Sequence, residues 1–377
     1  MRKIGILSLV LVCVSCKIFK MSGEEKLTRV SDEMQLELVN GQLLTNVLVK
    51  DSTYKFIFDT GASTMLVNDT MLIDKYNTVD KYKSNSRLIK SRVSIDKTAF
   101  TSSNELYAAE KEVVAVLIPE KLPCFDRSDV GLLSTNYFTK NVNKIVNLDF
   151  ESLKVKIIDE SQKQQMLLDY KEIKSEFFHF RKLIKIFLKI NGTEEAFLLD
   201  TGNSAIPFLI GEASKLKLNN GIEYQGTIMM GADHAVSIDR NIIYNNANVT
   251  IGKETIKSMV FYNQAYKSKY NNVGLSFIKN FNWILDYKNK KVYYKQIKAD
   301  FIKEVKPFRY RVYNTDDTLS ISVKLSSATA YNLGDQITSV NDVAVTTENI
   351  CELQSLLNKT EDWNTLKLEV IPVKTKK

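Results

Sequence analysis

The first half of the chain begins with apolar and polar positions in an order that predicts β-strands. Residues 36–39 and 43–49 lie on either side of Asn40-Gly41, a dipeptide that favours the tight turn of a β-hairpin. The apolar residues 54–58 predict the next strand, which ends at a polar turn. We therefore expect this half to open with a hairpin followed by a third strand.

The same pattern returns in the second half of the chain. Residues 183–190 and 196–199 predict two strands that flank a turn at Asn191-Gly192. In both halves the last strand runs directly into the tripeptide Asp-Thr-Gly, so the chain contains an internal repeat. The two tripeptides are Asp59-Thr60-Gly61 and Asp200-Thr201-Gly202.

A second motif follows each tripeptide at a similar distance. Gly131 and Gly274 each lie in an apolar-Gly-apolar segment, which is followed by an aromatic-bearing stretch and two further predicted strands. Because the order and spacing agree over most of each half, we expect the two glycines to occupy equivalent places in two related lobes.

The repeat sets the expected domain boundaries. The two lobes span residues 31–160 and 180–298, and a charged, helix-prone connector at 161–179 joins them. Residues 305–374 follow another pattern, with short alternating strands, one helical stretch and a closing strand, and this length suits a small domain. The predicted fold class is mainly β, with a bilobal, pseudo-twofold β-barrel body and a small α/β domain.

The N-terminus has a different character. Residues 1–16 combine a basic start, an apolar run too short to span a bilayer and a closing Cys16, which is the layout of a signal peptide. Its end resembles the bacterial lipobox, which implies lipidation of Cys16; a secretory signal without a lipid is the alternative. Residues 17–30 are expected to form a polar tether.

Composition and charge limit the possible partners. The hydrophobic fraction is 44% and the charged fraction 25%, as in ordinary folded proteins. The net charge is +8, but the lysines are spread along the chain without an arginine-rich stripe. We therefore expect no nucleic-acid partner.

Cysteine and histidine are scarce. Cys124 and Cys351 lie far apart and in different predicted domains, so no disulfide framework is expected. His179 and His234 are the only histidines and form no cluster with cysteine. The sequence thus predicts neither a metal site, nor a cofactor, nor a nucleophile activated by histidine.

The paired tripeptides and paired glycine segments resemble the bacterial retropepsin-like group of the aspartic peptidase superfamily, over residues 30–298. The resemblance implies that Asp59 and Asp200 share one proton and activate a water molecule between them. It also implies supporting roles for the residues around this dyad. Thr60 and Thr201 would bond to the opposite loop, Gly61 and Gly202 would permit close approach, Ser63 and Ser204 would hydrogen-bond near the carboxylates, and Gly131 and Gly274 would pack across the loops.

Residues 305–374 resemble a PDZ domain. Peptide-binding PDZ domains hold a C-terminal carboxylate with a glycine-containing loop, and residues 309–325 contain no glycine. Peptide capture and packing against the lobes are therefore both open. The whole architecture is similar to predicted envelope lipoproteins of Bacteroidetes-type bacteria, which implies a location in the cell envelope.

The hairpin that covers the cleft in this family is usually glycine-bearing. No glycine lies between Gly61 and Gly131, whereas residues 224–231 contain two and predict a flexible hairpin. We therefore expect the flap to come mainly from the second half, or a stiffer flap in the first.

The leading hypothesis is an aspartic endopeptidase that acts on peptides or unfolded proteins. It would be a monomer with an internal pseudo-dimer, tethered to the membrane by an N-terminal lipid. The alternative is a catalytically silent, peptide-binding envelope lipoprotein that uses the cleft and the PDZ-like domain. A third, weaker alternative is a lipoprotein whose repeat only builds a β-scaffold.

Overall fold

The structure is a computed structural model in which most of the chain beyond the N-terminus can be described. The described residues are 26–62, 65–67, 78–84, 91–116, 124, 129–135, 144–178, 183–204, 206–228, 239–266, 268, 270–315 and 317–373. The predicted signal peptide, with Cys16, and most of the predicted tether therefore lie outside them.

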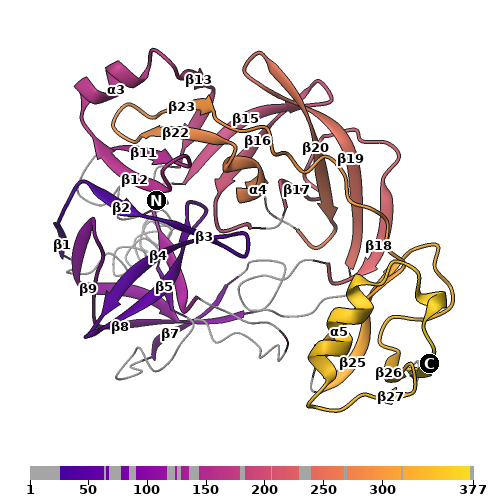
Figure 1. Ribbon diagram of the computed structural model, residues 1–377. Helices are drawn as coiled ribbons and strands as arrows, with labels where there is room; N and C mark the ends of the chain where they lie inside the picture. The colour runs from indigo at the N-terminus through magenta and orange to yellow at the C-terminus, as the bar shows by residue number, and fades with distance from the viewer. Residues whose placement is uncertain are drawn as a thin grey trace, which may run out of the picture.

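Lobe 1 is one mixed β-sheet in which the predicted hairpin and third strand are present (Figure 1). Asn40 and Gly41 adopt positive φ angles of 50° and 79°, as the tight turn requires. The strands are β1 (Lys26–Arg29), β3 (Glu37–Val39), β4 (Gln42–Val49), β5 (Ser52–Asp59), β6 (Leu66–Val67), β7 (Thr78–Ser84), β8 (Ser91–Ser103), β9 (Tyr107–Val116) and β10 (Gly131–Ser134). Because β1 pairs with β9, the last residues assigned to the tether belong to this sheet.

Lobe 2 repeats this plan strand for strand. β10 lies between β5 and β6, parallel to β5, and β21 lies in the same way between β16 and β17. The strands of lobe 2 are β14 (Ser175–Phe177), β15 (Ile184–Ile190), β16 (Thr193–Asp200), β17 (Phe208–Ile210), β18 (Ile222–Gly226), β19 (Asp239–Ile251), β20 (Glu254–Asn263) and β21 (Asn271–Gly274). The predicted internal repeat is therefore a repeat of structure.

A central sheet joins the two lobes. Its middle pair comes from both lobes, with Val146 opposite Leu285, and its strands run in the order β13 (Lys171–Ile173), β23 (Lys291–Gln296), β22 (Phe281–Asp286), β11 (Ile145–Asp149), β12 (Lys154–Ile158) and β2 (Glu33–Gln35). One continuous apolar cluster extends from lobe 1 through this sheet into lobe 2. The lobes are thus fixed to each other by both hydrogen bonding and core packing.

The connector is only partly helical. Helix α3 (Glu160–Met166) begins at a capping box, in which Asp159 and Gln162 each accept a hydrogen bond from the other's backbone. After it the chain forms β13 and β14 rather than more helix, which corrects the predicted helix-prone connector. Lys163 anchors α3 because its ammonium donates to the fully buried carboxylate of Asp286 at 2.8 Å.

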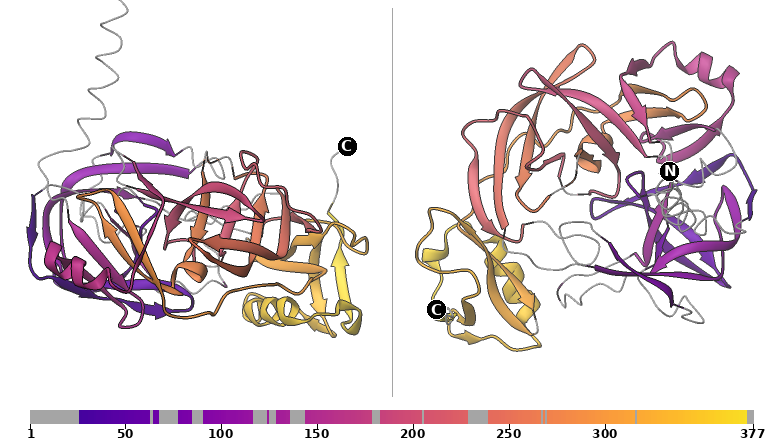
Figure 2. Two further views of the ribbon diagram at one scale, coloured as in Figure 1. Left: turned by 90° about the horizontal axis from the view of Figure 1, so that it is seen from above. Right: turned by 180° about the vertical axis from the view of Figure 1, so that it is seen from behind.

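The third domain has its own core, and it lies at one end of the molecule beside β18 (Figures 1 and 2). Helix α5 (Ile350–Lys359) buries Ile350, Leu353 and Leu357 against its strands. Its other elements are β24 (Tyr310–Thr315), β25 (Thr318–Leu325), β26 (Gln336–Val340), β27 (Val343–Ala344), a 3-10 turn (Trp363–Thr365) and β28 (Leu368–Ile371). The predicted fold class, a mainly β bilobal body with a small α/β domain, is confirmed.

Strand β18 contains the first residues of the predicted flexible hairpin at 224–231, whose flexibility stays a prediction. It pairs with β19 on one side and with β25 of the third domain on the other, and the Tyr224 side chain is fully buried. Gly226 has a φ of 106°, and a Cβ there would lie 2.0 Å from the Ser322 carbonyl oxygen. This glycine thus permits close packing between two domains, whereas residues 229–238 lie outside the described part of the chain.

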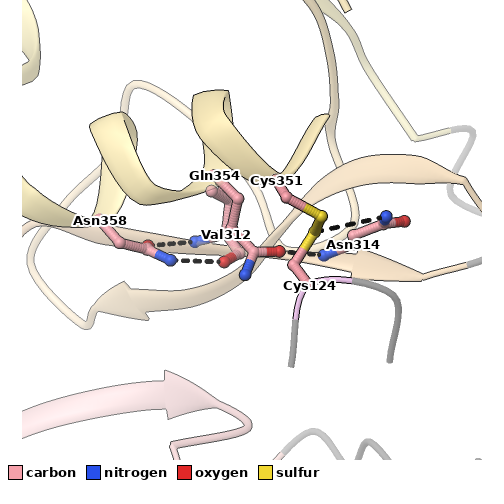
Figure 3. The surroundings of a disulfide bond; sticks show 6 residues. All are labelled: Cys124, Val312, Asn314, Cys351, Gln354 and Asn358. Atoms are coloured by element: carbon pink, nitrogen blue, oxygen red, sulfur yellow. Dashed lines mark hydrogen bonds between the residues drawn. A yellow bond between two sulfur atoms is a disulfide. The ribbon is translucent and has the colours of Figure 1, made fainter. Parts of the chain in front are cut away.

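The structure contains a disulfide, although the sequence predicted no disulfide framework. Cys351, on α5, is bonded to Cys124, which belongs to the lobe 1 segment between β9 and β10 (Figure 3). The two cysteines are 227 residues apart in sequence, and the third domain that carries Cys351 also pairs its β25 with β18 of lobe 2. The third domain is therefore attached to both lobes.

Candidate active site

The two tripeptides meet where the lobes face each other. Strand β5 ends at Asp59 and strand β16 ends at Asp200, so each strand delivers its aspartate into the turn that follows. A Cβ at Gly61 would lie 2.4 Å from Cγ of Asp200, and a Cβ at Gly202 would lie 2.4 Å from Cγ of Asp59. Each carboxyl group thus packs directly on the glycine of the opposite loop, where only glycine leaves room.

Reciprocal threonine contacts hold the loops together. The backbone N–H of Thr60 donates to Oγ1 of Thr201 at 3.0 Å, and the N–H of Thr201 donates to Oγ1 of Thr60 at the same distance. Each hydroxyl then donates to a carbonyl of the other lobe: Thr60 to Leu199 at 2.7 Å and Thr201 to Phe58 at 2.6 Å. Because both threonines are buried, this closed network fixes the aspartates relative to each other.

The two carboxyls, of which Asp59 is buried and Asp200 half-buried, are electrostatically coupled. Burial, followed by the charge of Asp200 and a hydrogen bond with its side chain, raises the pKa of Asp59 well above its usual range. The N–H groups of Gly61 and Ala62 oppose this shift by donating to the Asp59 carboxyl. Two acidic groups that share a hydrogen bond titrate together. The pair therefore retains one proton at pH values where an isolated aspartate has lost it.

Strands β10 and β21 pair with β5 and β16 in registers that are not the same in the two lobes. Gly274 lies opposite Asp200, but the residue opposite Asp59 is Ser134. Gly131 lies three residues earlier, where a Cβ would meet the Leu66 carbonyl oxygen at 2.1 Å. A Cβ at Gly274 would likewise meet a backbone carbonyl oxygen, that of Ile206, at 2.1 Å, so both glycines pack against the segment that follows their tripeptide although their registers with β5 and β16 differ.

Two asparagines in lobe 2 were not predicted as site residues. The side-chain amide of Asn272, on β21, donates to Oδ2 of Asp200, and the Asn203 amide donates to Oδ1 of Asn272 at 2.7 Å. The matching positions in lobe 1 are held by Leu132, one residue before Leu133 on β10, and by Ala62 after the tripeptide. Asparagine after Asp-Thr-Gly was visible in the sequence, but its partner is 69 residues away and is recognised only from the pairing of β16 with β21.

Of the two serines predicted to hydrogen-bond near the carboxylates, the structure describes only Ser204. Ser204 is described and half-buried, and it forms no hydrogen bond with either aspartate among the described contacts. The N–H groups of Gly202 and Asn203 donate to Oδ1 of Asp200 instead, at 3.0 and 3.1 Å. Ser63, His179 and His234 lie outside the described residues, so the predictions on them stay predictions.

The third domain uses its own side chains to cover the free edge of β24. The Asn358 amide accepts from the N–H of Val312 at 2.9 Å and donates to its carbonyl at 2.9 Å, and Gln354 accepts from the N–H of Asn314 at 2.6 Å (Figure 3). An added peptide strand would need these same backbone groups. Of the two alternatives that the sequence left open, this arrangement favours packing over peptide capture at this edge.

None of the described helices has the length and apolar character needed to cross a membrane. No protein-family model matches the chain, and no curated protein matches it. Among solved structures, the chain is similar to the basic 7S globulin from soybean, with a TM-score of 0.40, 8% identity and coverage of 74% of this chain and 100% of that one. It is also similar to conglutin gamma, a basic 7S globulin from lupine seeds, with a TM-score of 0.39, 8% identity and coverage of 73% and 96%.

Proposed function

We propose that this protein is an aspartic endopeptidase that hydrolyses peptide bonds with a water molecule held between Asp59 and Asp200. The observation that carries the proposal is the meeting of two carboxyls, one buried and one half-buried, each packed on the opposite glycine and fixed by reciprocal threonine hydrogen bonds. A scaffold role alone needs no such pair, because two acidic groups side by side, one of them buried, are costly.

The chemistry follows from the shared proton. The ionised carboxyl removes a proton from the water as its oxygen attacks the scissile carbonyl carbon, and the protonated carboxyl donates to the carbonyl oxygen. The threonine network keeps both groups in place, so little reorganisation accompanies the reaction. No metal or cofactor is part of this proposal.

The proposed substrates are peptides or unfolded proteins, as the resemblance to aspartic peptidases implies. We further propose that the protein is monomeric, since one chain supplies both aspartates. A lipid on Cys16 would hold it in the cell envelope, with the lobes on the periplasmic or outer side. The lipid and location rest on the N-terminal sequence alone.

The test incubates the mature chain with a peptide mixture at acidic to neutral pH. Mass spectrometry then detects the cleavage products. Asp59→Asn and Asp200→Asn should each lower the rate at least about 10²-fold, because each removes one half of the acid–base pair. Asp51→Asn, in the exposed turn between β4 and β5, is the matched control and should cleave normally.

Two outcomes would count against an endopeptidase. Full activity in either dyad variant would remove the aspartates from the mechanism. Retention of peptides without any cleavage by the wild-type chain would favour the alternative of a catalytically silent peptide-binding lipoprotein.

A further inference from the structure

The two carboxyl groups of the dyad have different hydrogen-bond donors. Asp59 receives backbone N–H groups from its own loop, of which Gly61 lies at 2.7 Å. Asp200 also receives backbone donors, from Gly202 and Asn203, and in addition the Asn272 side-chain amide at its other oxygen. Among the described residues the asymmetry comes from one side chain on β21; Ser63, which follows Ala62, lies outside them.

The orientation of the Asn272 amide is fixed by its neighbour. Its oxygen accepts from the Asn203 amide, so its NH₂ group is the one directed at Asp200. An N–H donor stabilises a carboxylate more than a carboxylic acid, because the hydrogen bond gains from the negative charge. In lobe 1 the equivalent positions carry Leu132 and Ala62, which offer no donor.

We propose that the Asn203–Asn272 pair makes Asp200 the ionised member of the dyad, which leaves the shared proton on Asp59. This assignment deepens the proposed function and rests on it for its catalytic meaning. Asp200 is then the base and Asp59 the acid, and Asn272 is a positioning residue that acts through Asp200.

The resulting proton movements balance. Asp200 takes a proton from the water while the water oxygen bonds to the carbonyl carbon, and Asp59 gives its proton to the carbonyl oxygen. When the carbon–nitrogen bond breaks, the proton on Asp200 passes to the leaving nitrogen. Asp59 recovers a proton from a hydroxyl of the intermediate, so both groups return to their starting states.

Two ionisable groups in the described part of the chain interact electrostatically with Asp200. Asp59 faces it from the end of β5, and Tyr266, which follows β20, is within range of its charge. Burial raises the pKa of Tyr266 to about 12, and its hydroxyl donates to the Tyr270 carbonyl at 3.0 Å, so it is neutral at acidic and neutral pH. The residues opposite the aspartates on β10 and β21, Ser134 and Gly274, carry no charge.

The first experiment is a titration that needs no activity. Carbon-13 NMR of the full mature chain with labelled aspartate carboxyls, assigned with Asp59→Asn and Asp200→Asn, follows each group with pH. We expect the Asp200 signal to move in the lower titration step and the Asp59 signal in the upper one. The reverse order would overturn the assignment, since it requires both asparagine amides to be turned over.

The second experiment replaces the two asparagines of lobe 2 with the side chains found at the matching positions of lobe 1. Asn272→Leu should raise the lower of the dyad's two apparent pKa values by about one unit, because one hydrogen bond to the charged form is lost. The acidic limb of the kcat/KM profile should move up by the same amount. Asn203→Ala, which copies Ala62, should move the limb in the same direction by less.

Asn271→Leu is the control, because the Asn271 amide is on the same strand but donates to Glu195 instead of the dyad. It should leave the acidic limb in place. If Asn272→Leu lowers activity equally at every pH, the residue is only structural and the proposal fails. If the wild-type chain cleaves nothing while Asp200 still titrates first, the endopeptidase proposal fails and the proton assignment stands.

Discussion

The two lobes make the same contacts through the threonine and glycine of their Asp-Thr-Gly loops, and they differ in the residues that surround those loops. Thr60 and Thr201 make mirrored hydrogen bonds of nearly equal length, and Gly61 and Gly202 each accommodate the opposite carboxyl group. One step outward, lobe 2 places an amide against its aspartate where lobe 1 has an apolar side chain. A pseudo-twofold site can therefore keep its geometry symmetric while its two charges become inequivalent.

The largest effect should come from the shared glycines. Gly61→Ala and Gly202→Ala each place a Cβ 2.4 Å from the opposite Cγ, so one carboxyl must move out of line. We expect both to lower cleavage at least about 10²-fold, and by similar amounts, as misplaced catalytic groups do. Peptide cleavage measured on the purified variants tests this.

Gly41→Ala and Gly192→Ala are matched controls at the hairpin turns of the two lobes. Both have positive φ angles but open space around the missing Cβ, so they should lower stability slightly and leave cleavage intact. A large difference between the Gly61 and Gly202 variants would show that the loops are not equivalent.

The next effect concerns the stability of the threonine network. Thr60→Val and Thr201→Val should each lower the free energy of unfolding by about 3 kcal/mol, because each leaves a buried N–H and a buried carbonyl without a partner. Urea denaturation measures this. Thr60→Ser and Thr201→Ser keep the hydroxyl and should lose much less, and unequal losses between lobes would contradict the symmetry of the network.

The smallest expected effect is a difference between the two aspartates in how they change the pH dependence of stability. Because the folded-state pKa of Asp59 lies above the unfolded value of 3.8, the folded state holds more protons between these values, and stability falls as pH rises through that window. Asp59→Asn should remove this fall, which is at most about 1.4 kcal/mol per pH unit. Urea denaturation of variant and wild type at several pH values from 4 to 7 measures the difference.

Asp200→Asn should only reduce the same slope, since it removes the neighbouring charge but leaves Asp59 buried. A wild-type chain whose stability has the same pH dependence as the Asp59→Asn variant would contradict the raised pKa.

The sequence predicted the elements that local patterns control. The Asn-Gly hairpins, the strands that end in the tripeptides and the third domain all follow from alternation and turn chemistry, which act over a few residues. The different registers of Gly131 and Gly274 along β5 and β16 were not predicted, because pairing between distant strands leaves no local signal.

Long-range contacts account for the other differences. Asn272 could not be assigned to Asp200, and Cys124 could not be assigned to Cys351, before the strands and domains were placed together. Gly226 was visible as part of a predicted hairpin, but its close approach to β25 of the third domain had no local signal. In each case the residue type was visible, and its partner was fixed by tertiary packing.

The disulfide described above turns most of the chain into a covalent ring. Asp200 lies on the ring between Cys124 and Cys351, and Asp59 lies on the segment that enters it. One peptide-bond break anywhere between these cysteines would leave the resulting pieces joined, so the two halves of the dyad could not drift apart. The disulfide would therefore keep this proposed peptidase in one covalent piece after a single cleavage of its own backbone within the ring.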